Sequence, residues 1–281
     1  MSKNIKGKVI IAGAGPGDPE LITYKAIIAL RKADVVLTDR LVSPAILERF
    51  VSAKAQIVFV GKQANSSASA SQASINKLLV IYANEGKQVV RLKGGDVTIF
   101  SNVVEELKTL NQHGIQYEII PGITAASGAA AYSGIPLTAR SLASSVRFLS
   151  YHKQGSFNEA YWKELAQTED TLVFYMSGEK LNDVIHKLTS YGINPKKLLA
   201  IVEQATTPLQ NVFVTNLYQP RAELKQRRIV SPSLVVIGKV VGLHRAFAWL
   251  QNSGSSAEYF SSLEDKSAED VIEVKQELLI A

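Results

Sequence analysis

The first apolar run of the chain ends in a glycine-rich turn, and this turn restricts the possible folds and ligands more than any other feature. The sequence VIIAGAGPGD, residues 9–18, places Gly13, Gly15 and Gly17 after the apolar run. Such glycines let the backbone bend sharply or approach a ligand closely. A dinucleotide-binding loop needs another glycine at the sixth position, where pyrophosphate meets a helix N-terminus. That position is Asp18, and a carboxylate there repels phosphate and caps the helix instead. The turn therefore predicts a ligand other than a pyrophosphate.

Two further apolar runs end in the same manner. Residues 87–93 lead into Gly94-Gly95-Asp96, and residues 116–120 lead into Pro121-Gly122-Ile123-Thr124. Ligands of open α/β sheets bind outside the carboxyl ends of the strands. Three glycine-containing strand ends predict one shared pocket.

The order of apolar and helical patterns predicts two α/β domains. In the first half, strands expected at 8–13, 34–38, 57–60, 88–92 and 116–120 alternate with helices at 20–32, 44–50, 71–85 and 101–113, which is typical of a parallel sheet. The pattern breaks near residues 134–144. Beyond it we expect strands at 146–150, 171–176, 198–203, 211–215 and 233–238, with helices at 158–166, 180–191 and 242–250. The predicted organisation is an N-terminal α/β domain over 1–138, a C-terminal α/β domain over 139–250 and an acidic, disordered tail over 251–281.

The run of small residues over 124–132 predicts a helix that packs tightly against its surroundings. Thr124 and Ala125, at its start, are the better candidates for ligand contact, because helix N-termini carry free N–H donors, and contact of the helix interior with a ligand is the alternative to tight packing alone.

Charge is distributed unevenly along the chain. The net charge of the 281 residues is +6. Residues 252–281 hold seven acidic residues and two lysines, a net charge of −5, which leaves +11 for the remainder (6 + 5). A basic body favours an anionic partner, although ordinary solvated lysines explain the excess equally well. A small molecule with many carboxylates fits, whereas no nucleic-acid-binding motif is found.

Composition also restricts the chemistry. The chain has no cysteine, which excludes disulfides and thiolate ligands, and its four histidines are far apart, so no metal site is expected. No apolar run is long enough to span a membrane, and no signal-peptide pattern precedes the first strand. A cytoplasmic protein is expected.

Six motifs in order carry a family resemblance. They are GAGPGDPELIT, Asp39-Arg40-Leu41-Val42, RLKGGD, PGITAASGAAAYSGIPLTAR, FYM and ATTPLQ. Together they resemble the uroporphyrinogen-III C-methyltransferases of the tetrapyrrole methylase superfamily, over residues 8–249. The resemblance implies two α/β domains with the cofactor in the cleft between them, a homodimer, and S-adenosyl-methionine as cofactor with S-adenosyl-homocysteine as product. It also implies uroporphyrinogen III, a polycarboxylate, as a substrate methylated twice to precorrin-2 for siroheme or cobalamin synthesis.

The same resemblance assigns residues to the cofactor. The matching positions are Pro16, Gly94, Gly95, Asp96, Ile99, Thr124, Ala125, Met176 and Ala205. Asp96 would bind the ribose hydroxyls or the methionine ammonium of the cofactor. Its alternative role is to cap a turn or helix.

Asp39 and Lys62 are the candidate catalytic residues. Each methylation must be followed by loss of a proton from the macrocycle, which a nearby base can accept. Asp39 ends an apolar strand, where such a base is expected. The alternative is that Asp39 braces the following turn. Lys62 matches a family position proposed as a proton donor, and it would equally serve to anchor a carboxylate. Arg40, Arg140 and Arg147 are candidates for binding substrate carboxylates, since a guanidinium pairs with them bidentately; each has an alternative as a surface ion pair.

The chain departs from the family pattern in three places. A GRGGEE stretch that usually follows the GGD loop is here Ser101-Asn102-Val103-Val104-Glu105-Glu106. A histidine-containing segment after Gly61-Lys62 is replaced by NSSASASQ, and a threonine-histidine-arginine appears as Thr138-Ala139-Arg140. Three alternatives therefore stay open: another tetrapyrrole C-methyltransferase, a non-catalytic protein that binds S-adenosyl-methionine, and an RNA-methylating relative.

Overall fold

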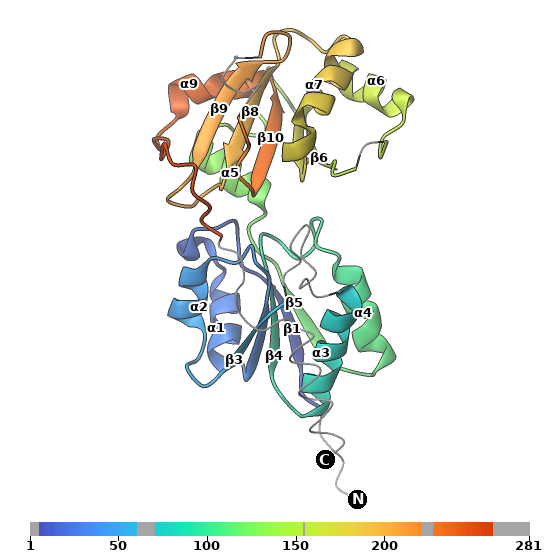
Figure 1. Cartoon of the computed structure of the whole chain (residues 1–281), viewed down its shortest axis with the longest axis vertical. Helices are drawn as coiled ribbons and strands as arrows, with labels where there is room; N and C mark the ends of the chain where they lie inside the picture. Colours follow the sequence, from blue (N-terminus) through green and yellow to red (C-terminus); the bar gives the residue numbers. More distant parts are fainter. Residues whose placement is uncertain (1–5, 61–70, 154, 221–226, 261–281) are drawn as a thin grey trace, which may run out of the picture. The chain divides into compact units, whose positions relative to one another are not determined.

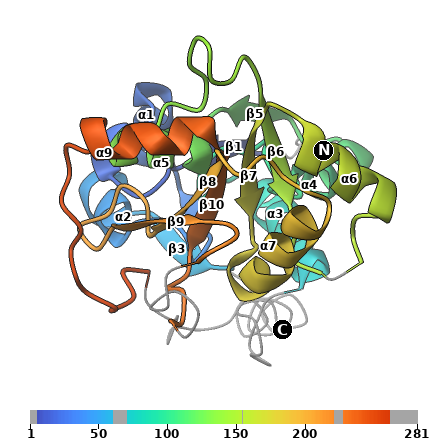
Figure 2. The same ribbon diagram turned by 90° about the horizontal axis from the view of Figure 1, so that it is seen from above.

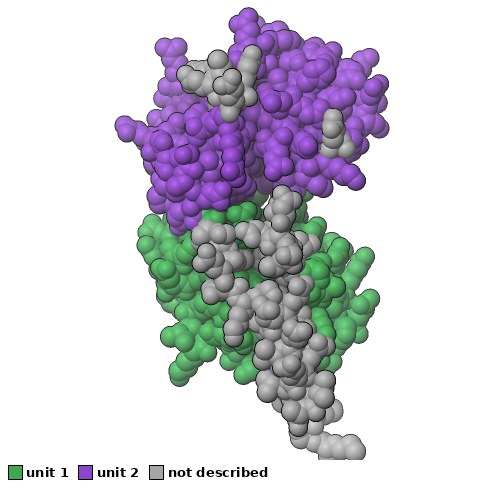
Figure 3. All heavy atoms as spheres, viewed as in Figure 1, with its two compact units in different colours: residues 1–124, 260–281 green, residues 125–259 purple. Residues whose placement is uncertain are grey.

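The chain folds into two compact units, each with its own sheet. The computed structural model describes residues 6–60, 71–153, 155–220 and 227–260. The first unit extends to Thr124 and the second comprises Ala125–Tyr259 (Figure 3). The prediction of two α/β domains is confirmed.

The first unit contains the predicted parallel sheet. Its strands are β1 (Val9–Gly13), β2 (Val35–Thr38), β3 (Gln56–Phe59), β4 (Val89–Lys93) and β5 (Tyr117–Ile120), in the order β3-β2-β4-β1-β5. All neighbouring pairs are parallel. The carboxyl ends of all five strands therefore meet at one edge of the sheet.

Helices cover both faces of this sheet. Figure 1 shows α1 (Tyr24–Lys32) and α2 (Pro44–Phe50) on one face, with α3 (Gln72–Asn84) and α4 (Val103–Gln112) on the other. Successive strand residues alternate between the two cores, as strand geometry requires. Ile11 packs with Leu78 of α3 and Leu110 of α4, whereas Ala12 packs with Leu30 of α1. Asp18 caps the short 3-10 helix η1 (Pro19–Leu21), since its carboxylate accepts a 2.9 Å hydrogen bond from the Glu20 amide.

The second unit has a mixed sheet. Its strands are β6 (Val146–Ser150), β7 (Thr171–Tyr175), β8 (Leu198–Glu203), β9 (Asn211–Asn216) and β10 (Ser233–Gly238), in the order β6-β7-β10-β8-β9. Only β6 and β7 are parallel; β10 runs antiparallel to β7 and β8, and β9 runs antiparallel to β8. Strands β7 and β8 consequently point in the same direction on either side of β10.

Both faces of the second sheet are also covered by helices. Figure 2 shows α5 (Ala125–Ser133) and α9 (His244–Phe247) together, away from α6 (Glu159–Gln167) and α7 (Leu181–Ser190). The Nδ1 atom of His244 lies 2.6 Å from the Ser133 carbonyl oxygen, which ties α9 to the end of α5. The helix expected at 242–250 is shorter than predicted, because the 3-10 helix η3 (Lys239–Leu243) precedes α9.

Helix α5 belongs to the second unit, so the division lies after Thr124 and precedes the boundary expected after Thr138. Ala126 and Ala129 of α5 pack against Val173 and Ala200 of the second sheet. Small side chains permit this close approach, as the sequence predicted for the helix interior. The break in pattern near residues 134–144 marks the connection between α5 and β6, inside the second unit.

The segment expected to begin a disordered tail is fixed in place. Residues 252–259 form several hydrogen bonds with β9 and with the loop after β8. Each of these bonds joins a backbone group to an asparagine or glutamine side chain, and apolar side chains take no part, so the apolar pattern of the sequence did not predict them. Residues 261–281 lie outside the described part of the chain.

Candidate functional site

Three glycine-containing loops meet at the carboxyl edge of the first sheet. The loops after β1 and β4 pair through two backbone bonds, Gly15 N to Gly95 O at 3.1 Å and Gly95 N to Gly15 O at 2.8 Å. A Cβ atom added at Gly122, after β5, would lie 2.3 Å from Gly95 O, and one added at Gly13 would lie 2.6 Å from it. The glycines are therefore needed for backbone contact between the loops. The three strand ends therefore meet, while the single pocket predicted from them stays a prediction.

Asp96 holds two of these loops together. Its Oδ2 accepts a 2.8 Å hydrogen bond from Gly122 N, and its Oδ1 accepts bonds from Thr98 N at 2.8 Å and Thr98 Oγ1 at 2.5 Å. Burial raises the pKa of Asp96, but the hydrogen bonds from Thr98 and Gly122 outweigh burial and leave the pKa below its ordinary value. The carboxylate is thus ionised and braces the turn, which was its alternative role. Direct contact of Asp96 with a cofactor stays a prediction.

The other cofactor residues predicted in the first unit lie in the same loops. Pro16 follows β1, Gly94 and Ile99 follow β4, and Thr124 ends the segment after β5. All four are partly exposed. Partly exposed residues beside glycines, which carry no side chains, are suited to a ligand that approaches the main chain.

In the second unit, the predicted residues also share one edge of the sheet. Met176 follows β7 and Ala205 follows β8, and the register of β10 places Tyr175 and Glu203 opposite its first two residues. The Tyr175 hydroxyl accepts a 3.1 Å hydrogen bond from Ala126 N, which brings the start of α5, and with it Ala125, to this edge.

Two of these loops have unusual backbone conformations. Met176 has a φ angle of 56°, and the residues on either side of Ala205 have positive φ angles as well, 47° at Gln204 and 67° at Thr206. Residues other than glycine adopt such angles rarely, and they occur most often at functional sites. Met176 is also half exposed, at 52%, which leaves this large apolar side chain available to a ligand.

Asp39 belongs to a network of buried charges. Its Oδ1 lies 2.5 Å from Arg91 Nη2, and Arg91 Nε lies 3.0 Å from Oε1 of Glu106. The same Oε1 accepts a 2.9 Å bond from Lys93 Nζ. The Arg91 and Glu106 side chains are 2% and 0% exposed, whereas that of Asp39 is 26% exposed. Asp39 is therefore the member of this charge network that reaches the surface, held there by a buried guanidinium.

Sequence reasoning missed the rest of the charge network. Arg91 and Lys93 are alternate residues of the buried strand β4, and Glu106 lies on α4. Two basic residues in an otherwise apolar run were the available signal, since buried cations require a nearby anion. Which anion pairs with them depends on how α4 packs on the sheet, and sequence alone does not give that.

Arg147 is corrected as a candidate substrate ligand. It forms ion pairs at 2.5 Å with both Glu164 and Asp170. It lies at the start of β6, where Thr171 begins the neighbouring β7, so it occupies the edge of the second sheet opposite to Met176. Two carboxylates satisfy its guanidinium, and we assign it a structural role.

The remaining candidates are placed less tightly. Arg40 follows Asp39 at the carboxyl edge of the first sheet and is partly buried. Arg140 is exposed, in the turn closed by the Ala139–Ala143 bridge. Lys62 lies outside the described residues.

Two other findings bear on the kind of site. Within residues 6–60, 71–153, 155–220 and 227–260, no three histidine, aspartate or glutamate side chains are grouped so that they could hold a metal ion. No helix in this described part is long and apolar enough to cross a membrane.

Comparison with known proteins supplies the family. Residues 8–220 match the family described as tetrapyrrole (corrin/porphyrin) methylases. The chain therefore belongs to the tetrapyrrole methylase family. It is 43% identical over 250 residues to a siroheme synthase of Thioalkalivibrio sulfidiphilus, covering 89% of this chain and 51% of that protein. It is 46% identical to a siroheme synthase of Acinetobacter baylyi, covering 87% and 53% respectively. The chain thus spans about half the length of these curated relatives.

Solved structures of this family have the same fold. A uroporphyrin-III-C-methyltransferase from Thermus thermophilus is 34% identical, with a TM-score of 0.72, over 87% of this chain and 98% of that chain. A structure of the Thermus enzyme complexed with S-adenosyl-homocysteine matches with a TM-score of 0.70. A cobalt precorrin-4 methyltransferase is 26% identical, with a TM-score of 0.74, over 83% of this chain and 95% of that chain.

Proposed function

We propose that this protein transfers two methyl groups from S-adenosyl-methionine to carbon atoms of uroporphyrinogen III, which gives precorrin-2. The observation that carries this proposal is the 34% identity to a uroporphyrin-III-C-methyltransferase from Thermus thermophilus, because this match covers 98% of the Thermus chain. The siroheme synthase relatives support the same substrate class. The product S-adenosyl-homocysteine is named in one of the matching structures.

The described residues fit an adenosyl cofactor. Gly13, Gly95 and Gly122 leave no side chains at the meeting point of three loops, and Met176 offers an exposed apolar surface. When bound, the cofactor supplies an activated methyl group on a sulfonium, so no metal is required. The task of the protein is to align the two reactants and exclude water, which lowers the barrier by up to about 7–11 kcal/mol. Pro16, Gly94, Ile99, Thr124, Ala125 and Ala205 are proposed to complete the binding surface.

Asp39 is proposed to accept the proton that the macrocycle loses after methylation. Arg91 binds Oδ1 of Asp39 and fixes the orientation of the carboxylate, while the partial exposure of this side chain leaves it accessible to substrate. Arg40, beside it in sequence, Arg140 and Lys62 are proposed to bind substrate carboxylates, with proton donation as the second possible role of Lys62.

An anaerobic assay with uroporphyrinogen III and isotopically labelled S-adenosyl-methionine, read by mass spectrometry, tests the proposal. Two labelled methyl groups per macrocycle are expected. No methylation, with S-adenosyl-homocysteine still bound, would favour a non-catalytic binding protein, to which the altered stretch after Asp96 points. Methylation of a later corrin precursor in place of uroporphyrinogen III would favour another member of the family, consistent with the likeness to cobalt precorrin-4 methyltransferase.

A cytoplasmic homodimer is proposed as the working form. Phe247 and Trp249 are 58% and 63% exposed, Leu250 beside them in sequence is also exposed, and Trp249 contacts the Tyr132 ring edge-on at 5.2 Å. Large exposed apolar side chains often belong to protein interfaces. Sedimentation velocity should show a dimer, and Trp249→Ser should weaken it; a monomer at all concentrations would exclude the homodimer.

A further inference from the structure

The loop after β8 has a strained backbone that needs external support. Gln204 and Thr206 have φ angles of 47° and 67°, and Ala205 between them is 8% exposed. A residue other than glycine in this region costs roughly 1 kcal/mol or more, and it persists only where its surroundings fix it. The contacts that fix this loop therefore determine where the Ala205 backbone lies.

Thr207 bonds within the loop, to Gln204 O at 2.8 Å, and two glutamines connect the loop to other segments. Gln210, at the end of the loop, accepts a 2.8 Å bond from Thr206 N and donates a 3.1 Å bond to Tyr132 O of α5. Gln204 uses both ends of its buried amide on the C-terminal segment: Nε2 donates to Ala257 O at 2.9 Å, and Oε1 accepts from Tyr259 N at 2.6 Å. The start of the loop is thus held by residues more than 50 positions later in the chain.

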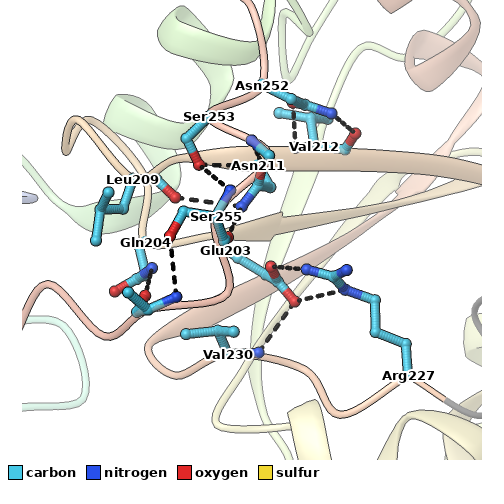
Figure 4. Close-up of polar contacts among 12 residues, drawn as sticks. Glu203, Gln204, Leu209, Asn211, Val212, Arg227, Val230, Asn252, Ser253 and Ser255 are labelled. Carbon is cyan, nitrogen blue, oxygen red and sulfur yellow. Dashed lines mark hydrogen bonds and ion pairs between the residues drawn. The ribbon is translucent and has the colours of Figure 1, made fainter.

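Residues 252–259, which we call the C-terminal strap, are bound along the edge strand β9. The Asn252 side chain pairs with both backbone groups of Val212, at 2.7 Å to N and 3.0 Å to O (Figure 4). Asn211 donates to Ser255 O at 2.8 Å and accepts from Gly254 N at 3.0 Å. Since β9 is the edge of the second sheet, the strap occupies backbone groups that would otherwise be unpaired.

The strap contributes little to the apolar core. Its residues are exposed except Ser255 and Tyr259, which are partly exposed, and none of them belongs to the two core clusters of the second unit. The end of β8, directly before the loop, is fixed independently of the strap, because buried Glu203 accepts bonds from Val230 N at 3.0 Å and Arg227 Nη2 at 3.0 Å (Figure 4). Loss of the strap should therefore release the loop without unfolding the sheet.

We propose that Gln204 is a positioning residue through which the C-terminal strap fixes the Ala205 backbone and thereby sets the affinity of the protein for S-adenosyl-methionine and S-adenosyl-homocysteine. This inference rests on the proposed function, which places Ala205 against the cofactor. It assigns a role in cofactor binding to a segment that lies beyond residues 8–220, where the family match ends.

Two variants test the inference by titration calorimetry with S-adenosyl-homocysteine. Gln204→Met keeps the length of the side chain and removes both bonds to the strap. Asn252→Ala loosens the strap at β9 without altering the loop, and it changes an exposed residue, so folding should be preserved. Loss of two hydrogen bonds should raise the dissociation constant about tenfold in each variant. The double variant should be no weaker than the weaker single variant, because both act through the same contact.

Asn216→Ala is the matched control. Asn216 lies at the other end of β9, and its side chain also makes two bonds to backbone groups, both accepted, from Tyr218 N at 2.8 Å and Gln219 N at 3.2 Å. Its dissociation constant should stay within twofold of the wild-type value. In turnover assays, the strap variants should raise KM for the cofactor and leave kcat at saturation unchanged, which a general loss of stability would not produce.

The outcomes separate the two proposals. If the wild-type protein does not bind S-adenosyl-homocysteine, the proposed function fails and this inference fails with it. If the wild type binds, and both strap variants bind within twofold of it, only the role of the strap is overturned.

Discussion

Replacing Glu106 by glutamine should destabilise the first unit far more than its single changed atom suggests. The buried charge network contains two cations, Arg91 and Lys93, and two anions, Asp39 and Glu106. Glu106→Gln leaves two cations with one anion at a site where the Glu106 side chain is fully buried. Removing one partner of a buried ion pair costs about 3–5 kcal/mol. Because the glutamine Oε1 still accepts a hydrogen bond, we expect a loss near 3 kcal/mol.

Urea denaturation at pH 7 measures this loss. Both tryptophans, Trp162 and Trp249, lie in the second unit, so tryptophan fluorescence follows the second unit alone, and far-ultraviolet circular dichroism, which sums both units, is needed to include the first. Glu118→Gln is the matched control, since Glu118 pairs with Lys8 and Lys25 through partly exposed side chains. Exposed pairs contribute less than about 1 kcal/mol.

The pH dependence provides a second check. Burial lowers the pKa of Lys93, and neighbouring Arg91 lowers it further, while Glu106 opposes both effects. Without Glu106, the folded-state pKa of Lys93 should fall further below its ordinary value, so that charged Lys93 destabilises the fold at neutral pH. This penalty should shrink as pH rises through the folded-state pKa toward the unfolded value of about 10.4, because Lys93 is then neutral in both states. A loss at pH 7 no larger than that of Glu118→Gln, or one that grows with pH, would refute the reasoning.

Four further substitutions are expected to have separable effects. Gly122→Ala places a Cβ atom 2.3 Å from the Gly95 carbonyl oxygen, in the loop after β4. The affinity for S-adenosyl-homocysteine, measured by calorimetry, should therefore fall at least about tenfold. Unchanged affinity would show that cofactor binding does not depend on contact between these loops. Asp39→Asn should lower the rate of methyl transfer roughly 10²-fold or more, while the cofactor affinity stays within about tenfold of the wild-type value; near-normal turnover would show that Asp39 is structural. Lys62→Met should raise KM for the macrocycle if Lys62 anchors a carboxylate, and it should lower kcat if Lys62 donates a proton. Asp170 has a pKa of about 2 because it accepts hydrogen bonds from Ser145 and Arg147. Its contribution to stability should be complete above its unfolded pKa, near 4, and should be lost as pH falls toward 2. The melting temperatures of wild type and Asp170→Asn should therefore differ at neutral pH and converge between pH 4 and pH 2.

Local patterns in the sequence were sufficient for most of the fold. The alternation of apolar runs with amphipathic segments predicted the parallel sheet of the first unit, because strand and helix periodicities are properties of neighbouring residues. Glycine at strand ends predicted that the loops after β1, β4 and β5 meet, since parallel strands end at one edge of a sheet. Asp18 as a helix cap followed from the chemistry of its side chain alone.

Contacts between distant segments required the tertiary structure. Arg91 and Asp39 are 52 residues apart in sequence, and only the adjacency of β2 and β4 brings them together. Gln204 meets Tyr259 because the C-terminal strap runs back along β9, held by bonds between backbone groups and the side chains of Asn211 and Asn252, and the partners of such polar side chains cannot be read from the sequence. Arg147 is a third case: the sequence left open a substrate ligand and a surface ion pair, and only the packing of α6 and of the turn before β7 places Glu164 and Asp170 beside it. Local propensity and turn chemistry are encoded residue by residue, whereas the partner of a buried or strained group is decided by which surfaces the packed elements bring into contact.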